Sequence, residues 1–64
     1  MNKAPDESLR VSTLETISFC RDRSETLIVT NYPGKYRILA KDLLKCSGYL
    51  ILEYIKRGIY RSKP

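Results

Sequence analysis

The stretch TLIVTNYPGKYRIL, residues 26–39, decides the fold of this 64-residue chain. Residues 26–30 are mainly β-branched and apolar, which favours a strand, and residues 36–39 resume the same character. Between them, Pro33 presets φ for the first central position of a type II turn, and Gly34 supplies the positive φ at the second. Two strands joined by such a turn predict a β-hairpin.

After the hairpin the pattern changes to a helical period. Small and apolar residues recur at spacings of three and four: Ala40, Leu43, Leu44, Ser47, Leu50, Ile51, Tyr54 and Ile55. Ser47 is a good N-cap and Gly48 weakens a helix interior, so we expect a break there. Two helices follow, at about 39–45 and 48–57, and Gly58 lies where the second would stop. The short apolar run 48–57 is also compatible with a strand, and both readings stay open.

The amino-terminal part is less regular. Residues 1–8 are polar and aperiodic, which is typical of a disordered lead-in. Within residues 9–22, Ser12 and Glu15 have the capping-box spacing of a helix. The same segment is rich in β-branched and aromatic residues, namely Val11, Thr13, Thr16, Ile17 and Phe19. Because these favour extended structure, we expect a strand at about 14–21.

The predicted fold class is α+β, in one small domain over residues 9–64 with a basic carboxyl-terminal tail. An antiparallel hairpin or three-stranded sheet at about 14–39 is followed by a helix or helix-turn-helix at about 39–57. A chain of this length buries only roughly 60% of the surface that its unfolded form exposes, so a disulfide, a metal or a second subunit would help it. A homodimer is therefore a reasonable expectation.

Composition excludes several classes of protein. The two cysteines, Cys20 and Cys46, are too few for a secreted disulfide scaffold, and the sequence alone leaves open whether they pair. No apolar run is long enough to span a membrane, so we expect a cytoplasmic protein without a membrane partner. The chain has no histidine and no GxxxxGK[ST], GxSxG or HExxH motif. We expect no enzymatic activity, no catalytic residue, no metal and no cofactor.

Charge is unevenly distributed along the chain. Residues 1–25 carry four basic and five acidic groups, a net charge of −1, whereas residues 26–64 carry eight basic and two acidic groups, a net charge of +6. A surplus of this kind attracts phosphates or an acidic protein surface, although basic residues also simply keep a small protein soluble.

Residues 39–61 also follow the order of a DNA-binding motif. The residues that carry it are Ala40, Leu43, Leu44, the turn Lys45-Cys46-Ser47, Leu50, Ile51, Tyr54, Ile55 and Gly58, followed by Ile59-Tyr60-Arg61-Ser62. In this order the segment resembles the helix-turn-helix of excisionases, MerR-type regulators and small phage repressors. The resemblance implies a small regulatory protein of phage or plasmid type that binds nucleic acid, with double-stranded DNA preferred and a single strand possible.

The residues expected to contact nucleic acid are Lys35, Arg37, Lys41, Lys45, Tyr49, Lys56, Arg57, Arg61 and Lys63. By the pattern of the motif, Tyr49 and Lys56 would enter a groove while the other residues contact the backbone. Five tyrosines, Tyr32, Tyr36, Tyr49, Tyr54 and Tyr60, are also interleaved with basic residues. On a sheet face that arrangement suits single-stranded nucleic acid, with 35–37 as its most exposed instance, although tyrosine is also an ordinary strand residue.

A second function is compatible with the same segment. Residues 49–55 are apolar nearly all round, and a helix of that kind is buried on more than one side. The second side could meet another copy of the chain or a different protein, as in a small viral or accessory inhibitor of a host protein. The residues expected at such an interface are Tyr49, Leu52 and Tyr54.

Overall fold

The computed structural model describes residues 7–31 and 33–62. Its elements are a short 3-10 helix η1 (Glu7–Leu9), α1 (Leu14–Asp22), β1 (Thr26–Asn31), β2 (Gly34–Leu39), α2 (Ala40–Leu43), α3 (Gly48–Arg57) and β3 (Ile59–Arg61). The strands form one antiparallel sheet in the order β2-β1-β3. This architecture confirms the predicted α+β class with a three-stranded sheet.

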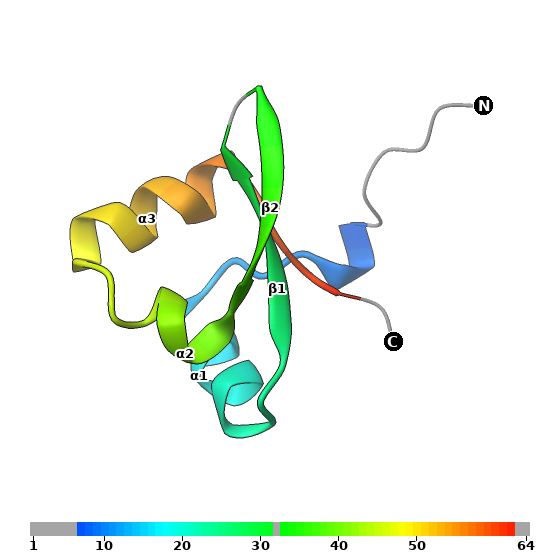
Figure 1. The fold of residues 1–64 in the computed structure, drawn as a ribbon, viewed down its shortest axis with the longest axis vertical. Coiled ribbons are helices and arrows are strands. Elements are labelled where there is room, and N and C mark those ends of the chain that lie inside the picture. The colour runs from blue at the N-terminus through cyan, green and yellow to red at the C-terminus, as the bar shows by residue number, and fades with distance from the viewer. Residues whose placement is uncertain (1–6, 32, 63–64) are drawn as a thin grey trace.

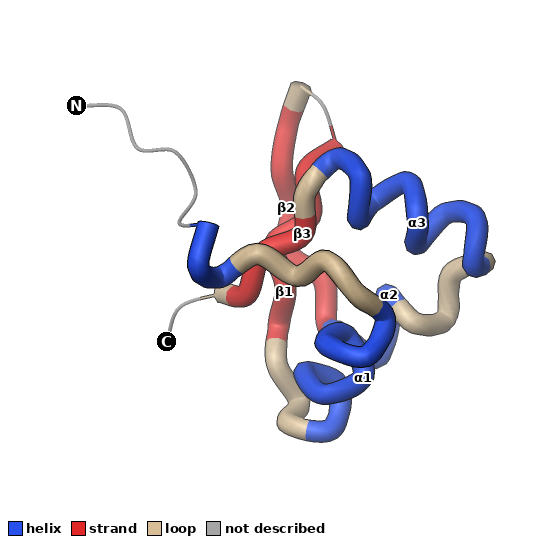
Figure 2. The backbone as a smooth tube through the Cα atoms, turned by 180° about the vertical axis from the view of Figure 1, so that it is seen from behind, coloured by secondary structure: helices blue, strands red, loops and turns tan. Residues whose placement is uncertain are grey.

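The helices gather on one side of the sheet. Figures 1 and 2 show α1, α2 and α3 together on that side, with η1 on the other side next to β3. Within the described residues, the face opposite the three α-helices is otherwise uncovered. None of the described helices is long and apolar enough to cross a membrane.

The predicted hairpin is confirmed, but its turn is not the predicted one. The register runs from Thr26 opposite Leu39 to Asn31 opposite Gly34, so only positions 32 and 33 lie in the loop. Gly34 is the first residue of β2 and does not have a positive φ, so the type II turn centred on Pro33 and Gly34 is wrong. A loop of two residues is the usual connection in a hairpin. Here it leaves Gly34 free to pair with Asn31 at the end of the ladder, instead of lying in the turn.

The strand expected at about 14–21 is wrong, because this segment is the helix α1. Thr13 is extended and caps the helix, since its Oγ1 accepts a hydrogen bond from the Thr16 backbone nitrogen at 3.1 Å. Ile17 and Cys20, one turn apart, are fully buried. Burial of Ile17 and Cys20 on one side of the helix outweighs the preference of the β-branched residues for extended structure. The capping residue is Thr13 and not Ser12.

The two-helix prediction for the second half is confirmed, which also settles residues 48–57 as helix. Ser47 is the N-cap of α3, and its Oγ accepts a hydrogen bond from the Leu50 backbone nitrogen at 3.2 Å. The helix ends at Gly58, whose N–H donates to the Tyr54 carbonyl at 2.8 Å. Gly58 has a φ of 127°, a backbone conformation that favours glycine.

The third strand comes from the carboxyl-terminal end and not from the predicted region 14–39. In β3, Ile59 lies opposite Val29 and Tyr60 lies opposite Ile28. On its other edge, the Ile59 carbonyl accepts a hydrogen bond from the Val11 backbone nitrogen at 2.7 Å. The strand β3 therefore joins the segment before α1 to the centre of the sheet.

The core lies between the sheet and the helices. Its buried members are Val11, Ile17, Cys20, Leu27, Ala40, Leu43, Ile51 and Ile59. Burial alternates along β1, with Leu27 and Val29 buried and Ile28 half-buried, as expected for a strand with one covered face. Both cysteines are free thiols. The predicted disordered lead-in 1–8 lies outside the described residues, except for Glu7 and Ser8, which begin η1.

Candidate nucleic-acid interface

The open face of the sheet carries a row of three residues in direct register. Ile28, at the centre of β1, lies opposite Arg37 on β2 and opposite Tyr60 on β3. Residues directly opposite one another share a face of the sheet, so all three project away from the helices. Lys35 and Leu39 project to the same side as Arg37, because side chains alternate along a strand. We call Ile28, Lys35, Arg37, Leu39 and Tyr60 the open face.

Three cations on and beside this face have no acidic partner. Ion pairs occupy most of the other basic groups: Arg21 with Asp22, Arg23 and Arg61 with Glu25, Lys45 with Asp42, and Lys56 with Glu53. Arg57, at the end of α3, donates to the neutral Asn31 side chain instead. Among the described residues, Lys35, Arg37 and Lys41 have no carboxylate within ion-pair distance. Because none of them forms an ion pair with a described carboxylate, these cations place positive charge along β2 and its continuation into α2.

Two shallow hollows lie along this line of cations. The first, of ≈ 260 Å³, is lined by Ile28, Lys35, Tyr36 and Arg37. The second, of ≈ 210 Å³, is lined by Arg21, Ser24, Glu25, Leu39 and Lys41. The first hollow thus combines apolar and cationic lining residues, and the second lies further along the chain, at the end of β2 and the start of α2.

Tyr60 is held in place at the far side of the open face. A Cβ on Gly58 would lie 3.0 Å from the Tyr60 Cε1 atom and 3.3 Å from the Thr30 Oγ1 atom, so the ring rests closely on the glycine. The Arg10 guanidinium lies 5.8 Å from the ring centroid. Its Nη2 atom also donates to the Ile55 carbonyl at the end of α3, at 3.4 Å. The ring is thus positioned by residues of three elements.

Tyr36 does not join the open face, although it stands between Lys35 and Arg37 in the sequence. It lies on the helix side, where its hydroxyl donates to the Tyr54 hydroxyl at 2.8 Å. The two rings meet edge to face, with centroids 6.4 Å apart. The hydrogen bond with Tyr54, together with burial, raises the pKa of Tyr36 to about 12. This pair fastens β2 to α3, so Tyr54 is directed toward the sheet.

The helical residues predicted to contact nucleic acid form a different surface. Tyr49 and Leu52 on α3 are 75% and 55% exposed. Next to them, the Lys56 Nζ atom pairs with Glu53 at 3.6 Å. In the turn after α2, Lys45 pairs with Asp42 at 3.6 Å. The outward side of α3 is therefore largely apolar, with its nearest cation and anion paired.

Two further predicted residues have structural partners, and one is not described. Arg57 donates to the Asn31 Oδ1 atom at 3.2 Å, which ties the end of α3 to the hairpin. Lys63 lies outside the described residues. Arg61 donates to both carboxylate oxygens of Glu25, from Nε at 3.0 Å and from Nη2 at 2.7 Å.

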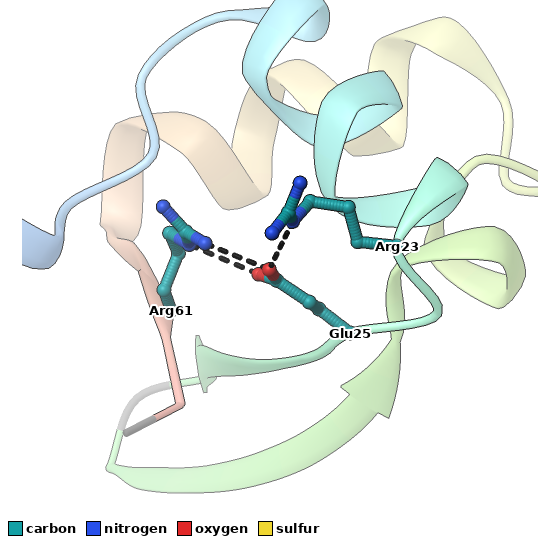
Figure 3. A network of polar contacts seen from close by, with 3 residues as sticks. All are labelled: Arg23, Glu25 and Arg61. Atoms are coloured by element: carbon teal, nitrogen blue, oxygen red, sulfur yellow. Dashed lines mark hydrogen bonds and ion pairs between the residues drawn. The ribbon is translucent and has the colours of Figure 1, made fainter. Parts of the chain in front are cut away.

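Figure 3 shows that Arg23 approaches the same carboxylate from α1, with its Nε atom 3.5 Å from Glu25. The hydrogen bonds from Arg61 lower the pKa of Glu25, and the Glu25 carboxylate in turn raises the pKa of Arg61. Both guanidinium groups also lie against the Phe19 ring, at 5.1 and 5.7 Å from its centroid. This cluster fastens β3 to α1, so Arg61 has a structural role in addition to any phosphate contact.

The sequence prediction missed Ile28, Leu39 and Tyr60 as members of one surface. Alternation along β1 and β2 was the available signal for the first two, but the position of Tyr60 depends on β3, which was not expected. Within the described residues, no three histidine, cysteine or carboxylate side chains gather as metal ligands would. Comparisons with protein-family models, with curated proteins and with solved structures found no match to this chain.

Proposed function

We propose that this protein binds nucleic acid through the open face of its sheet. The observation that carries the proposal is a line of cations, Lys35 and Arg37 on β2 and Lys41 in α2, that have no carboxylate within ion-pair distance among the described residues. Phosphate contacts from lysine and arginine supply most of the affinity of sequence-independent binding. A cation that is already paired with a carboxylate contributes less, because it must give up that partner.

The open face is a better candidate than α3 for the same ligand. The helix-turn-helix resemblance implies that Tyr49 and Lys56 enter a groove of duplex DNA, in a regulator of phage or plasmid type. Groove reading depends on polar side chains that reach base edges. The outward side of α3 offers the apolar Leu52 and a Lys56 that is paired with Glu53. The sheet offers unpaired cations beside an apolar floor.

The test compares two double variants of equal charge. Fluorescence anisotropy with a labelled single strand and a labelled duplex is measured over a range of salt concentrations. Three phosphate contacts give a slope of about −2 in log K against log salt for a single strand. Lys35→Ala with Arg37→Ala should lower the affinity at least tenfold and reduce the slope to about −0.7. The control, Lys45→Ala with Lys56→Ala, should stay within twofold of the wild type.

Two outcomes contradict the proposal. A larger loss in the control variant would assign binding to the helices instead of the sheet. Binding that is undetectable at low salt for both ligands would exclude nucleic acid as the partner.

Exposed apolar residues on α3 favour a second candidate, the binding of another protein. Tyr49, Leu50 and Leu52 are 75%, 39% and 55% exposed on a helix of ten residues. A pull-down at moderate salt, from a lysate of the cells in which the protein acts, compares the wild type with Tyr49→Ser and Leu52→Ser. A stoichiometric partner that both substitutions remove supports this function, as in a small viral or accessory inhibitor. Equal recovery by all three proteins contradicts it.

A further inference from the structure

We infer that the ligand is a single strand that lies along β2, with phosphates on Lys35, Arg37 and Lys41 and bases turned across β1 toward Tyr60. The inference rests on the proposed function and adds the form of the ligand and its direction on the sheet.

The row across the sheet is charged at one end and apolar or aromatic along the rest, as a nucleotide is. Arg37 lies at one end, Ile28 in the middle and Tyr60 at the other end. Neighbouring strands are about 4.8 Å apart, so the backbone positions of Arg37 and Tyr60 are separated by about 10 Å. A nucleotide likewise carries its charge at the phosphate and an apolar planar surface at the base. The charged end therefore faces β2, and the base lies over Ile28.

The two hollows indicate a chain and not an isolated nucleotide. One is lined by Lys35 and Arg37, and the other by Leu39 and Lys41 together with Arg21, Ser24 and Glu25, whose carboxylate is paired with Arg61. Both follow the same strand, and the four residue steps from Lys35 to Leu39 span about 13 Å. Each strand of a duplex rises 3.4 Å per nucleotide, so that length holds at most roughly four nucleotides, and an unpaired, more extended strand covers it with fewer.

The chemistry of the open face distinguishes a single strand from a duplex. In a duplex the base planes are stacked inside, and only their edges are available for hydrogen bonds. Apart from its cations and from Thr26 and Thr30, which lie opposite Leu39 and Lys35, the open face presents Ile28, Leu39 and the ring of Tyr60. These three side chains suit the flat surface of a base better than its edge. Base planes are accessible only where the strand is unpaired.

The experiment compares three ligands at low salt: an oligothymidylate of eight nucleotides, an abasic strand of the same length and charge, and a duplex of eight base pairs. We expect the oligothymidylate to bind at least tenfold more tightly than the abasic strand, and more tightly than the duplex. Affinity should rise steeply from two to four nucleotides and only slightly from four to eight.

The matched variants separate base contact from charge. Ile28→Thr keeps a β-branched residue in β1 but removes apolar surface, and should weaken oligothymidylate binding about fivefold while leaving abasic binding unchanged. Ile28→Val and the exposed α3 variant Leu52→Thr serve as controls and should bind as the wild type does. Circular dichroism confirms that each variant is folded.

The outcomes separate this inference from the proposed function. If the abasic strand binds as tightly as the oligothymidylate, or if the duplex binds more tightly, the inference is overturned while nucleic-acid binding stands. If none of the three ligands binds, the proposed function fails as well. An equal loss of oligothymidylate and abasic binding in Ile28→Thr also contradicts the base contact.

Discussion

The two faces of the sheet are built from the same strands but have opposite chemistry. On the helix side, Leu27, Val29 and Ile59 are fully buried against the core. On the open face, their neighbours Ile28 and Tyr60 are only half-buried. Within the described residues, no buried side chain is polar or charged, so the unpaired cations lie outside the core.

This difference teaches that a packed position and a surface position are separated by a single residue step along a strand. Because side chains alternate along a strand, moving one position along β1 changes the role of a residue from packing to surface chemistry. The free energy of unfolding of native proteins is about 5–15 kcal/mol, and small domains lie near or below the low end of that range. The covered face therefore tolerates little loss of packing. Substitutions on the half-buried open face should cost less stability than those on the covered face.

The largest expected effect tests this contrast directly. Leu27→Ala removes a fully buried side chain and should lower the free energy of unfolding by about 2–5 kcal/mol. Ile28→Ala, one position away on the open face, should cost about 1 kcal/mol. Urea unfolding followed by circular dichroism measures both. Equal losses would show that the open face is packed against something in solution, and the contrast between the faces would not hold.

The next effect concerns the glycine beneath Tyr60. Gly58→Ala places a Cβ 3.0 Å from the Tyr60 ring at a φ of 127°, and should destabilise the protein by about 1–3 kcal/mol. The control is Gly48→Ala at the start of α3, where a Cβ meets nothing within 4 Å. That substitution should be neutral or stabilise by up to about 1 kcal/mol. The reverse ranking in urea unfolding would show that Tyr60 is not held against Gly58.

A smaller, pH-dependent effect concerns the covered side, where Glu25 joins β3 to α1. Arg61 lowers the pKa of Glu25 in the folded state, so its stabilising effect is complete above the unfolded pKa, near 4.5. It is lost as the pH falls through the lower folded pKa. Glu25→Gln should lower the melting temperature at pH 7, and the difference from the wild type should shrink below about pH 4.5. The side chain of Arg61 is 38% exposed, so water screens the pair and the decrease is modest. A constant difference from pH 7 to pH 2 would contradict this assignment.

The smallest effect is chemical and leaves stability unchanged. Cys20 is fully buried, and burial raises the pKa of its thiol, whereas Cys46 is half-buried. A thiol-specific reagent at pH 8 should therefore modify Cys46 first, and Cys20 only at the rate of unfolding. The Cys46→Ser variant isolates the slow reaction. Rapid labelling of that variant would show that the covered face opens readily in the native protein.

Local patterns predicted those parts of the fold that depend on local chemistry. The hairpin, the N-cap at Ser47 and the helix stop at Gly58 each follow from residues a few positions apart. The segment of α1 was predicted as a strand, because its β-branched residues favour strands and its burial depends on a sheet formed later in the chain. The strand β3, which pairs with β1 and contacts the segment before α1, has only three residues, too few to show an alternation.

The candidate site was predictable only in part for the same reason. Lys35, Arg37 and Lys41 were identified from composition, and the structure places them without acidic partners among the described residues. Sequence alone could not show that Lys45 and Lys56 are paired with Asp42 and Glu53. Each of these ion pairs joins residues three positions apart, and the local backbone must bring their side chains together. Ile28 and Tyr60 are more than thirty positions apart and become neighbours only when β1 pairs with β3.

The position of β3 in the sheet also has a kinetic consequence. The strand β1 meets β2 across a two-residue loop, but it meets β3 only after the whole segment 40–57 has been placed. Closing a long loop is slower than forming a hairpin, so we expect β3 to dock last in folding. Weakening β3 should then accelerate unfolding more than it slows folding. Because Tyr60 arrives with β3, the open face is completed only in this final step.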